Sequence, residues 1–400
     1  MGLYKYYPIP SDRMGALWTL MPVSGCSVVE YGTAGTTRFV LNCFARMGGE
    51  KHCNIYTTHL DETDIVMGQV IRLDKAVDKI VKTEKPSVLF IMYSTVASVI
   101  GTDIEAYCNI YNDRYPDTKI IYIPEDGFKG NWTLGVKSIL KLLVENIPKA
   151  VNKTIKPTFN IIGSCADDFN YLSDCFEIKR ILKGAFQAEP VCTMTSNTSI
   201  KDIEDMGSAH VNIVLRQEGL QAAKILEKRF GTPYILGRPY GLKGTLHWLS
   251  QISEVLKLGS NTEFIAEEEN ILKGVIRIAA GFTRQSKAKV TMGGHYDVIK
   301  PLAEFLKHEV GFNISDIWCS SPDRATEAIP FYKEAEWEKL VLTGEYSIIM
   351  GNAVALDLAK ADCKKLQIDI PNYKFSPLKY PYSPYVGFRG AHYILNEMVK

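Results

Sequence analysis

The sequence predicts an α/β protein with three doubly wound domains, each built on a parallel sheet with helices on both faces. Three observations lead to this fold class. Short runs rich in Val and Ile alternate with amphipathic segments such as IRLDKAVDKIVKTEK and LQAAKILEKRFG, whose apolar residues recur at helical spacing. The short runs are almost continuously apolar, as in parallel strands buried on both faces. Finally, 400 residues are too many for one core and favour two or three domains.

The expected strands fall into three sets along the chain. They are expected at 16–21, 53–58, 87–93 and 119–124, then at 158–163, 190–194, 210–215 and 233–239, and last at 289–294, 312–320, 346–352 and about 372–376. The segment NIPKAVNKTIKPT resembles a linker, and a long helical tract from about 246 to 280 leads to the last set. We therefore expect domains at 1–155, 156–285 and 286–400, each of ordinary size.

Composition and charge exclude several classes of function. The formal net charge is +1, which provides no general attraction to nucleic acid or to an acidic membrane. The N-terminus lacks the apolar core of a signal peptide, and no apolar run could cross a bilayer, so we expect a cytoplasmic protein. The motifs GxxxxGK[ST], GxSxG and HExxH do not occur, and no GxGxxG opens a helix after a strand. Simple kinase, hydrolase and dehydrogenase functions therefore lose support.

The nine cysteines form no CxxC pair. An odd number in a cytosolic chain argues against a disulfide framework, so any metal cluster would need ligands from distant segments or from a second chain. Cys26 is notable because it lies in MPVSGCSVVEYGTAGTTRF, between an apolar run and the Gly/Thr-rich start of a helix. It is either a small residue required at a turn, or a thiolate at the carboxyl edge of a strand beside a helix N-terminus.

Other candidate site residues follow from the position of the strand ends. Ligands of doubly wound sheets bind beyond the carboxyl ends of the strands. On this basis we expect Arg216, Arg238, His295 and Arg389 to face a common cleft between domains. Guanidinium groups there would suit carboxylates or phosphates, but each could equally be a surface residue or an inter-domain salt-bridge partner. Two cysteines at strand ends either touch a ligand or are small buried residues; they are Cys165 and Cys319.

Several blocks of sequence resemble the nitrogenase component 1 superfamily. They are PVSGC…EYGTAGTTRF, YTTHLDETDIVMG before a helix, and YSTVASVIGTDIEA, followed in the family's order by NIIGS, HVNIVLRQEGLQAAKILEKRFGTPYI and SPYVGFRG. The superfamily includes the two subunit types of the molybdenum–iron protein and the scaffold on which its cofactor is assembled. It also includes the dark-operative protochlorophyllide reductase and a nickel-tetrapyrrole reductive cyclase. The resemblance implies three Rossmann-like domains, in agreement with the division above.

The resemblance also implies that Cys26 is a ligand of an iron–sulfur cluster at an interface between two component 1 subunits. Cluster iron prefers sulfur ligands. The family's cysteine upstream of the GC turn is missing, and another is replaced at about Thr95, so a large eight-iron cluster is not expected. A [4Fe–4S] cluster shared by two subunits is the alternative. Local candidates for its remaining ligands are His59, Asp61 and Glu125, whereas the expected apolar fillers are Cys43 and Cys53.

The expected substrate site departs from the family as well. Arg216 stands where the molybdenum–iron catalytic subunit has a cysteine, and the cofactor-binding histidine is absent near Pro377. Covalent binding of the iron–molybdenum cofactor, and with it dinitrogen reduction, is not expected. Our catalytic candidates are Arg216, His295 and Arg238; our cofactor-binding candidates are Cys26, Thr95 and Arg389, with Cys26 as the metal ligand. A tyrosine group either lines a flat aromatic ligand or packs the C-terminal segment; it comprises Tyr380, Tyr382 and Tyr385.

Three functions remain open on this basis. The resemblance implies, first, an oxidoreductase subunit in an anaerobic cytoplasm: an ATP-dependent iron–sulfur reductase docks over Cys26 and passes electrons through the cluster to a substrate or cofactor between the domains. The second is a non-catalytic scaffold or maturation protein that holds a metal cluster or tetrapyrrole for transfer. The third is a cluster-free binder of small molecules. We expect a homodimer, or a heteromer with another component 1-like chain.

Overall fold

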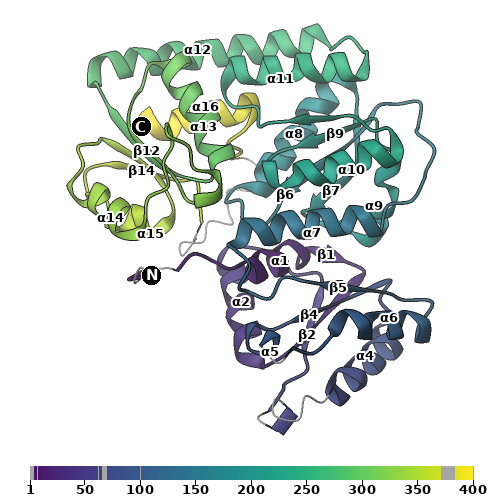
Figure 1. Cartoon of the computed structure of the whole chain (residues 1–400). Helices are drawn as coiled ribbons and strands as arrows, with labels where there is room; N and C mark the ends of the chain where they lie inside the picture. The colour runs from purple at the N-terminus through teal and green to yellow at the C-terminus, as the bar shows by residue number, and fades with distance from the viewer. Residues whose placement is uncertain are drawn as a thin grey trace.

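The computed structural model confirms the α/β fold class, with three main sheets wrapped by helices (Figure 1). The structure describes residues 4–6, 8–61, 63–64, 70–99, 101–370 and 383–399. Within these residues each main sheet has four strands, and all of its strand pairs are parallel. None of the helices in these ranges is both long and apolar enough to cross a bilayer.

The first sheet is formed by the N-terminal part of the chain, in the order β3-β2-β4-β5. Its inner strand β2 is buried along all six residues, as expected for a strand covered on both faces. The strands are β2 (Cys26–Tyr31), β3 (Asn54–Thr57), β4 (Val88–Tyr93) and β5 (Lys119–Ile123). The helices are α2 (Ala34–Arg46), α4 (Ile71–Glu84), α5 (Thr95–Ser98) and α6 (Ile104–Arg114).

The segment 16–21 belongs to a helix, so the strand predicted there was wrong. Helix α1 (Asp12–Leu20) is buried at all nine residues, and periodicity alone does not distinguish a fully buried helix from a buried strand. It packs against α7 (Trp132–Asn146). The two helices approach closely because a Cβ on Gly15 would lie 2.0 Å from the backbone oxygen of Trp132. The first strand of the sheet is instead β2, which the sequence did not predict.

The second sheet has the order β10-β9-β6-β7, and a short parallel pair ties it to the first part of the chain. In this pair β1 (Val23–Ser24) lies beside β8 (Thr198–Ser199). Helix α7 also packs on α10 (Leu220–Phe230), so one apolar cluster extends from the first sheet into the second. The strands are β6 (Thr158–Ser164), β7 (Glu189–Thr195), β9 (Val211–Val214) and β10 (Tyr234–Leu236). The helices are α8 (Tyr171–Phe186), α9 (Ile200–Glu204), α10 (Leu220–Phe230) and α11 (Gly241–Leu256).

The third sheet has the order β12-β11-β13-β14. Its edge strand β14 was not predicted because its sequence, KKLQ, is mostly polar. The strand expected at about 372–376 lies outside the described residues. The strands are β11 (Lys289–Gly294), β12 (Asn313–Cys319), β13 (Ile348–Gly351) and β14 (Lys364–Gln367). The helices are α13 (Tyr296–Phe305), α14 (Glu334–Thr343) and α15 (Ala353–Leu358).

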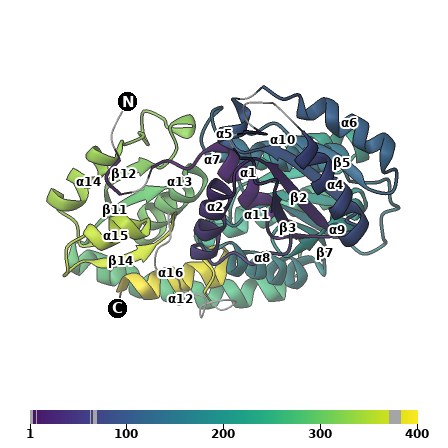
Figure 2. The same ribbon diagram turned by 90° about the horizontal axis from the view of Figure 1, so that it is seen from below.

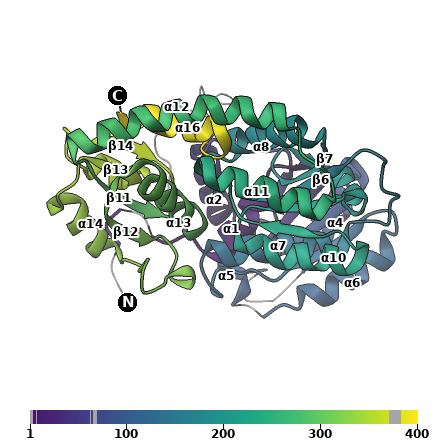
Figure 3. The same ribbon diagram turned by 90° about the horizontal axis from the view of Figure 1, so that it is seen from above.

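Two helices connect the second sheet with the third. Helices α12 (Thr262–Ser286) and α16 (Gly387–Val399) lie side by side along one edge of the molecule (Figures 2 and 3). The C-terminal helix α16 also packs against α8 and α11 of the second sheet. A single cluster of buried apolar residues therefore extends across both sheets. This packing holds the carboxyl ends of the strands in the second sheet close to those in the third.

Candidate functional site

A buried group of charged side chains lies where the carboxyl ends of the second and third sheets meet. Arg216 follows β9 and is 2% exposed. Its Nη1 donates to both carboxylate oxygens of Asp167 at 2.8 Å, and its Nε donates to Oε2 of Glu218 at 2.8 Å. Burial alone would lower the pKa of Arg216, but the charges of Asp167 and Glu218 outweigh it and raise the pKa well above its usual value. The arginine is therefore a fixed cation.

A glycine makes room for this arginine. Gly163 in β6 has a φ of +92°, and a Cβ there would lie 2.7 Å from Cγ of Arg216. Both the backbone conformation and the close approach favour glycine. The aliphatic part of Arg216 can therefore lie directly over β6.

Arg238, which follows β10, is held by a second set of acidic groups. Its Nη2 donates to Oδ2 of Asp168, its Nε donates to the carbonyl oxygen of Leu215 at 3.0 Å, and Asp174 lies 3.9 Å from its Nη1. Burial and the nearby Asp168 raise the pKa of Asp174 to about 7. Both arginines are thus neutralised by carboxylates of the same chain.

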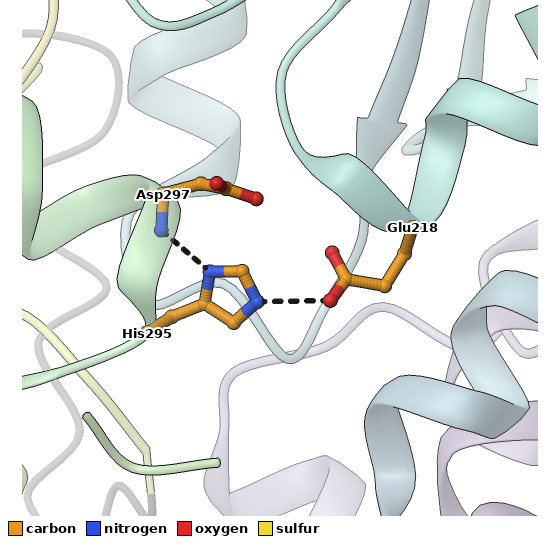
Figure 4. A group of neighbouring side chains, drawn as sticks. All are labelled: Glu218, His295 and Asp297. Carbon is orange, nitrogen blue, oxygen red and sulfur yellow. Dashed lines mark hydrogen bonds and ion pairs between the residues drawn. The ribbon is translucent and has the colours of Figure 1, made fainter. Parts of the chain in front are cut away.

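His295 connects this group to the third sheet. It follows β11 and caps α13, because its Nδ1 accepts the backbone N–H of Asp297 at 3.3 Å. Its Nε2 lies 3.2 Å from Oε1 of Glu218 and 3.3 Å from Nη2 of Arg216. Figure 4 shows the ring pointing from the third sheet toward Glu218. Burial alone would lower the pKa of His295, but the carboxylate of Glu218 outweighs it and the pKa is raised.

Three of these groups have the composition of a metal site. Ligand atoms of Glu218, His295 and Asp297 lie within 4.8 Å of one another. However, Asp297 already accepts the backbone N–H of Gln217 at 2.7 Å and a guanidinium N–H of Arg324 at 2.7 Å. Glu218 is bound to Arg216, whose positive charge would repel a metal ion. The geometry therefore fits a closed network of ion pairs better than a metal centre.

The structure brings three of the predicted residues together around one small cavity. Its lining comprises Trp132, Asp167, Asp168, Arg216, Arg238, His295, Val298, Ile368 and Asp369. Arg389, expected in the same cleft, is not in this lining: it lies exposed on α16, where its backbone N–H donates to Glu177 at 3.2 Å. Thr95 begins α5 at the end of β4, in the first sheet. The predicted cleft is thus largely occupied by paired charges.

Cys26 lies at the opposite edge of its sheet from the one predicted. It is the first residue of β2, at the amino end, because the preceding apolar run is helix α1 and the turn leads into the strand. It is 4% exposed, and its thiol donates to the carbonyl oxygen of Val23 at 3.4 Å. The contact with the thiol of Cys26, together with burial, raises the pKa of Cys53 well above its usual value. Two thiols therefore meet beside the β1–β8 pair.

The other candidate ligands are dispersed. Asp61 pairs with Arg72, and His59 is exposed on the same loop. Burial raises the pKa of Glu125, and it raises the pKa of Cys165 to about 12 and that of Cys319 to about 11. Tyr385 stacks on Tyr393 at 5.9 Å and donates to the carbonyl oxygen of Gln367 at 2.7 Å, as expected for a packing role. Tyr380, Tyr382 and Pro377 lie outside the described residues.

The acidic residues that neutralise the two arginines were not predicted from the sequence. Asp167 and Asp168 follow directly on the end of β6 in the stretch SCADD. Two adjacent acidic residues beyond one strand end, with arginines beyond two other strand ends of the same sheet, indicate ion pairing at this edge of the sheet. Asp174 could not be predicted in this way. It lies on helix α8, away from a strand end, and its contact with Arg238 depends on how that helix packs in the tertiary structure.

The chain matches a known protein family along almost its whole length. The sequence profile of the family described as nitrogenase component 1 type oxidoreductase matches residues 11–400. The chain belongs to this family. The solved structure of nitrogenase Cp1 at pH 6.5 superposes with a TM-score of 0.79, covering 99% of this chain and 93% of that one at 18% identity. It supports the same fold.

Several curated relatives in this family are named for cofactor biosynthesis, and two of them are described here. The nitrogenase iron-molybdenum cofactor biosynthesis protein NifE of Clostridium pasteurianum is 26% identical over 73% of this chain and 64% of its own length. The corresponding protein NifN of Nostoc sp. is 22% identical over 96% of this chain and 90% of its own length. The nitrogenase vanadium-iron protein beta chain of Trichormus variabilis is 26% identical over 89% of this chain and 80% of its own length. This family member therefore spans less than two thirds of the NifE relative that it matches.

Proposed function

We propose that this family member is a non-catalytic scaffold subunit that holds a metal cluster as cargo during cofactor maturation. The proposal draws on the relatives named for cofactor biosynthesis, which match up to 96% of the chain. These findings favour the scaffold over the reductase that the resemblance implied first. A second component 1-like chain completes the proposed assembly.

The structural observation that supports this proposal is that Arg216 is ion-paired with acidic residues of its own chain. Its guanidinium is bound by Asp167 and Glu218 and lies beside His295. A residue that stabilises charge in a transition state needs donors aimed at the reacting group. Here the nitrogen atoms Nε and Nη1 are already bound to carboxylates of the chain itself. The site is therefore better suited to supporting structure than to turning over a substrate.

Cys26 is the proposed cluster ligand, with Cys53 as its neighbour. A four-iron cluster takes four ligands, and these two thiols are too few within the described residues. The proposal therefore requires the second chain to supply the rest. The junction formed by β1 and β8 is a suitable place, because Cys26 follows β1 by two residues.

Anaerobic purification with the co-expressed second chain tests the scaffold. Iron and acid-labile sulfide should be present in the complex and should move to an acceptor protein on incubation, without substrate turnover. Absence of iron and sulfide from the complex would contradict the proposal.

The reductase remains a second candidate because one relative, the vanadium-iron protein beta chain, matches 89% of this chain. Turnover by the complex with an ATP-dependent iron–sulfur reductase, ATP and a reductant would favour it. The scaffold predicts cluster transfer and no turnover in the same assay.

A further inference from the structure

The chain between the first and second sheets contains an exposed basic segment, which we call the linker strip. It comprises residues 149–156, KAVNKTIK, between the end of α7 and the start of β6. Every residue of the strip is exposed, and none belongs to a helix or a strand. Val151 is 41% exposed and Ile155 is 105% exposed. Single exposed apolar side chains are common on proteins, so the strip is notable for what surrounds these two.

Both ends of the linker strip are fixed to the second sheet and its helices. The backbone N–H of Lys149 donates to the carbonyl oxygen of Glu204 at 2.9 Å, and its Nζ lies 2.6 Å from the Glu204 carboxylate. Gly207 lies beneath this end, since a Cβ there would lie 2.5 Å from the carbonyl oxygen of Lys149. Beyond the other end, Thr158 begins β6, and its N–H donates to Nδ1 of His210 at 3.1 Å. A segment held in this way loses less conformational entropy when it binds a partner.

The backbone N–H groups of the linker strip are free to bind a partner. Within the part of the chain that the structure describes, the N–H groups of residues 150–156 donate to no other residue. An exposed segment whose backbone groups lack partners can pair with an added strand of another chain. Main-chain hydrogen bonds then provide affinity, and side chains at alternate positions provide specificity. Val151, Lys153 and Ile155 occupy such alternate positions.

The start of the strip carries positive charge that no carboxylate neutralises. Arg229 donates to the carbonyl oxygen of Pro148 at 2.9 Å, and Nζ of Lys119 donates to the last carbonyl oxygen of α7. Burial, together with the charge of Arg229, lowers the pKa of Lys119. Among the described residues, none forms an ion pair with Lys119, Arg229, Lys153 or Lys156. An anion beside these cations would relieve their mutual repulsion.

The far end of the strip is positive as well, but its surroundings are not. Burial, together with the charge of Lys153, lowers the pKa of His210, so the two side chains lie close together. Glu204, which binds the start of the strip, and Asp205 both pair with Lys201. A broad anionic surface such as a lipid bilayer would meet these carboxylates too and be repelled by them. A narrow acidic segment avoids them, so the charge distribution favours a peptide.

We propose that the linker strip binds an extended acidic segment of a partner protein. Carboxylates of that segment pair with Lys153 and Lys156 and with the cations at the start of the strip. Its apolar side chains cover Val151 and Ile155, and its backbone carbonyl groups accept the unpaired N–H groups. This interaction surface goes beyond the proposed scaffold function, because it uses neither of the two thiols assigned to the cluster.

Fluorescence anisotropy of the full chain, prepared without iron, tests the surface with a labelled peptide of sequence Glu-Val-Asp-Ile-Glu-Leu-Asp-Glu. We expect saturable binding of one peptide per chain, weaker by at least about tenfold when the salt concentration rises from about 0.05 M to about 0.5 M. Absence of saturable binding would overturn the proposal. Binding of phosphatidylserine vesicles without binding of the peptide would overturn it in favour of a lipid surface. Because no iron is present, either failure is distinct from failure of the scaffold function.

Charge-reversing substitutions locate the binding. The double variant Lys153→Glu and Lys156→Glu should bind the peptide at least about tenfold more weakly, since attraction becomes repulsion. Lys75→Glu is the matched control, because Lys75 is an exposed lysine of α4, far along the chain from the strip. It should bind the peptide like the wild type. Circular dichroism and thermal unfolding establish that both variants fold. Undiminished binding by the folded double variant would place the peptide elsewhere and overturn the assignment.

Discussion

Arg216 and Asp167 form a buried ion pair in which one guanidinium nitrogen lies 2.8 Å from both carboxylate oxygens. Both side chains are 2% exposed. Removing one partner of a buried pair leaves an uncompensated charge, whereas replacing both partners with apolar residues is often tolerated. This relationship joins the ends of β6 and β9 in the second sheet and makes Arg216 primarily a structural residue.

Arg216→Met should therefore lower the free energy of unfolding by about 3–5 kcal/mol. Urea unfolding followed by circular dichroism measures the loss. Arg389→Met is the matched control, because Arg389 is exposed on α16, and surface substitutions change stability by about 0.5 kcal/mol or less. Equal stability of the two variants would contradict a structural role for the buried pair.

Gly163→Ala should destabilise the same region. The φ of +92° at this residue and the 2.7 Å approach of a Cβ to Arg216 together predict a loss of about 1–3 kcal/mol. Gly274→Ala in helix α12 is the control, since its Cβ meets nothing within 4 Å. That change should stabilise the protein by up to about 1 kcal/mol. Thermal unfolding of both variants would reveal opposite shifts in Tm; a loss in neither would argue against strain at Gly163.

Asp369 should make stability depend on pH. Burial raises its pKa to about 7 from 3.8, while the nearby His295 opposes this shift. Between these values the folded protein binds a proton that the unfolded chain has released, so the free energy of unfolding falls as pH rises. The slope is at most about 1.4 kcal/mol per pH unit for one group.

Asp369→Asn should remove this contribution and make the curve less steep between about pH 4 and pH 7, while the similar contribution of Asp174 remains. Asp117→Asn changes an exposed carboxylate and should leave the curve as in the wild type. Urea unfolding at several pH values measures both. Parallel curves for Asp369→Asn and the wild type would show that this carboxyl group does not titrate near neutrality.

Cys26→Ala should abolish the iron and acid-labile sulfide content of the anaerobic complex with its second chain. Loss of a thiolate ligand removes a bond that cluster iron requires. Cys43→Ala is the control, because Cys43 is only half-buried and lies on α2. Unchanged iron in folded Cys26→Ala would remove Cys26 from the proposed cluster site.

Much of the fold could be predicted because parallel strands covered on both faces leave a strong apolar pattern. The predicted bounds are those of β11, and the predicted range encloses β13. Strand β6 extends one residue beyond its predicted range. Helix α1 was mistaken for a strand because it is buried on every side, and β14 was missed because an edge strand can be polar. These two errors share a cause: periodicity reports exposure and not backbone conformation.

The amino-acid sequence by itself determined the α/β class, the family, and the placement of Arg216, Arg238 and His295 beyond strand ends. Only the tertiary structure decided that acidic residues neutralise these arginines, that Cys26 opens a strand instead of ending one, and that Lys119 and Arg229 lie beside the linker strip. The reason is physical. Local patterns specify which segments become strands and helices, but the partner of a buried charge or ring depends on which distant segments pack together.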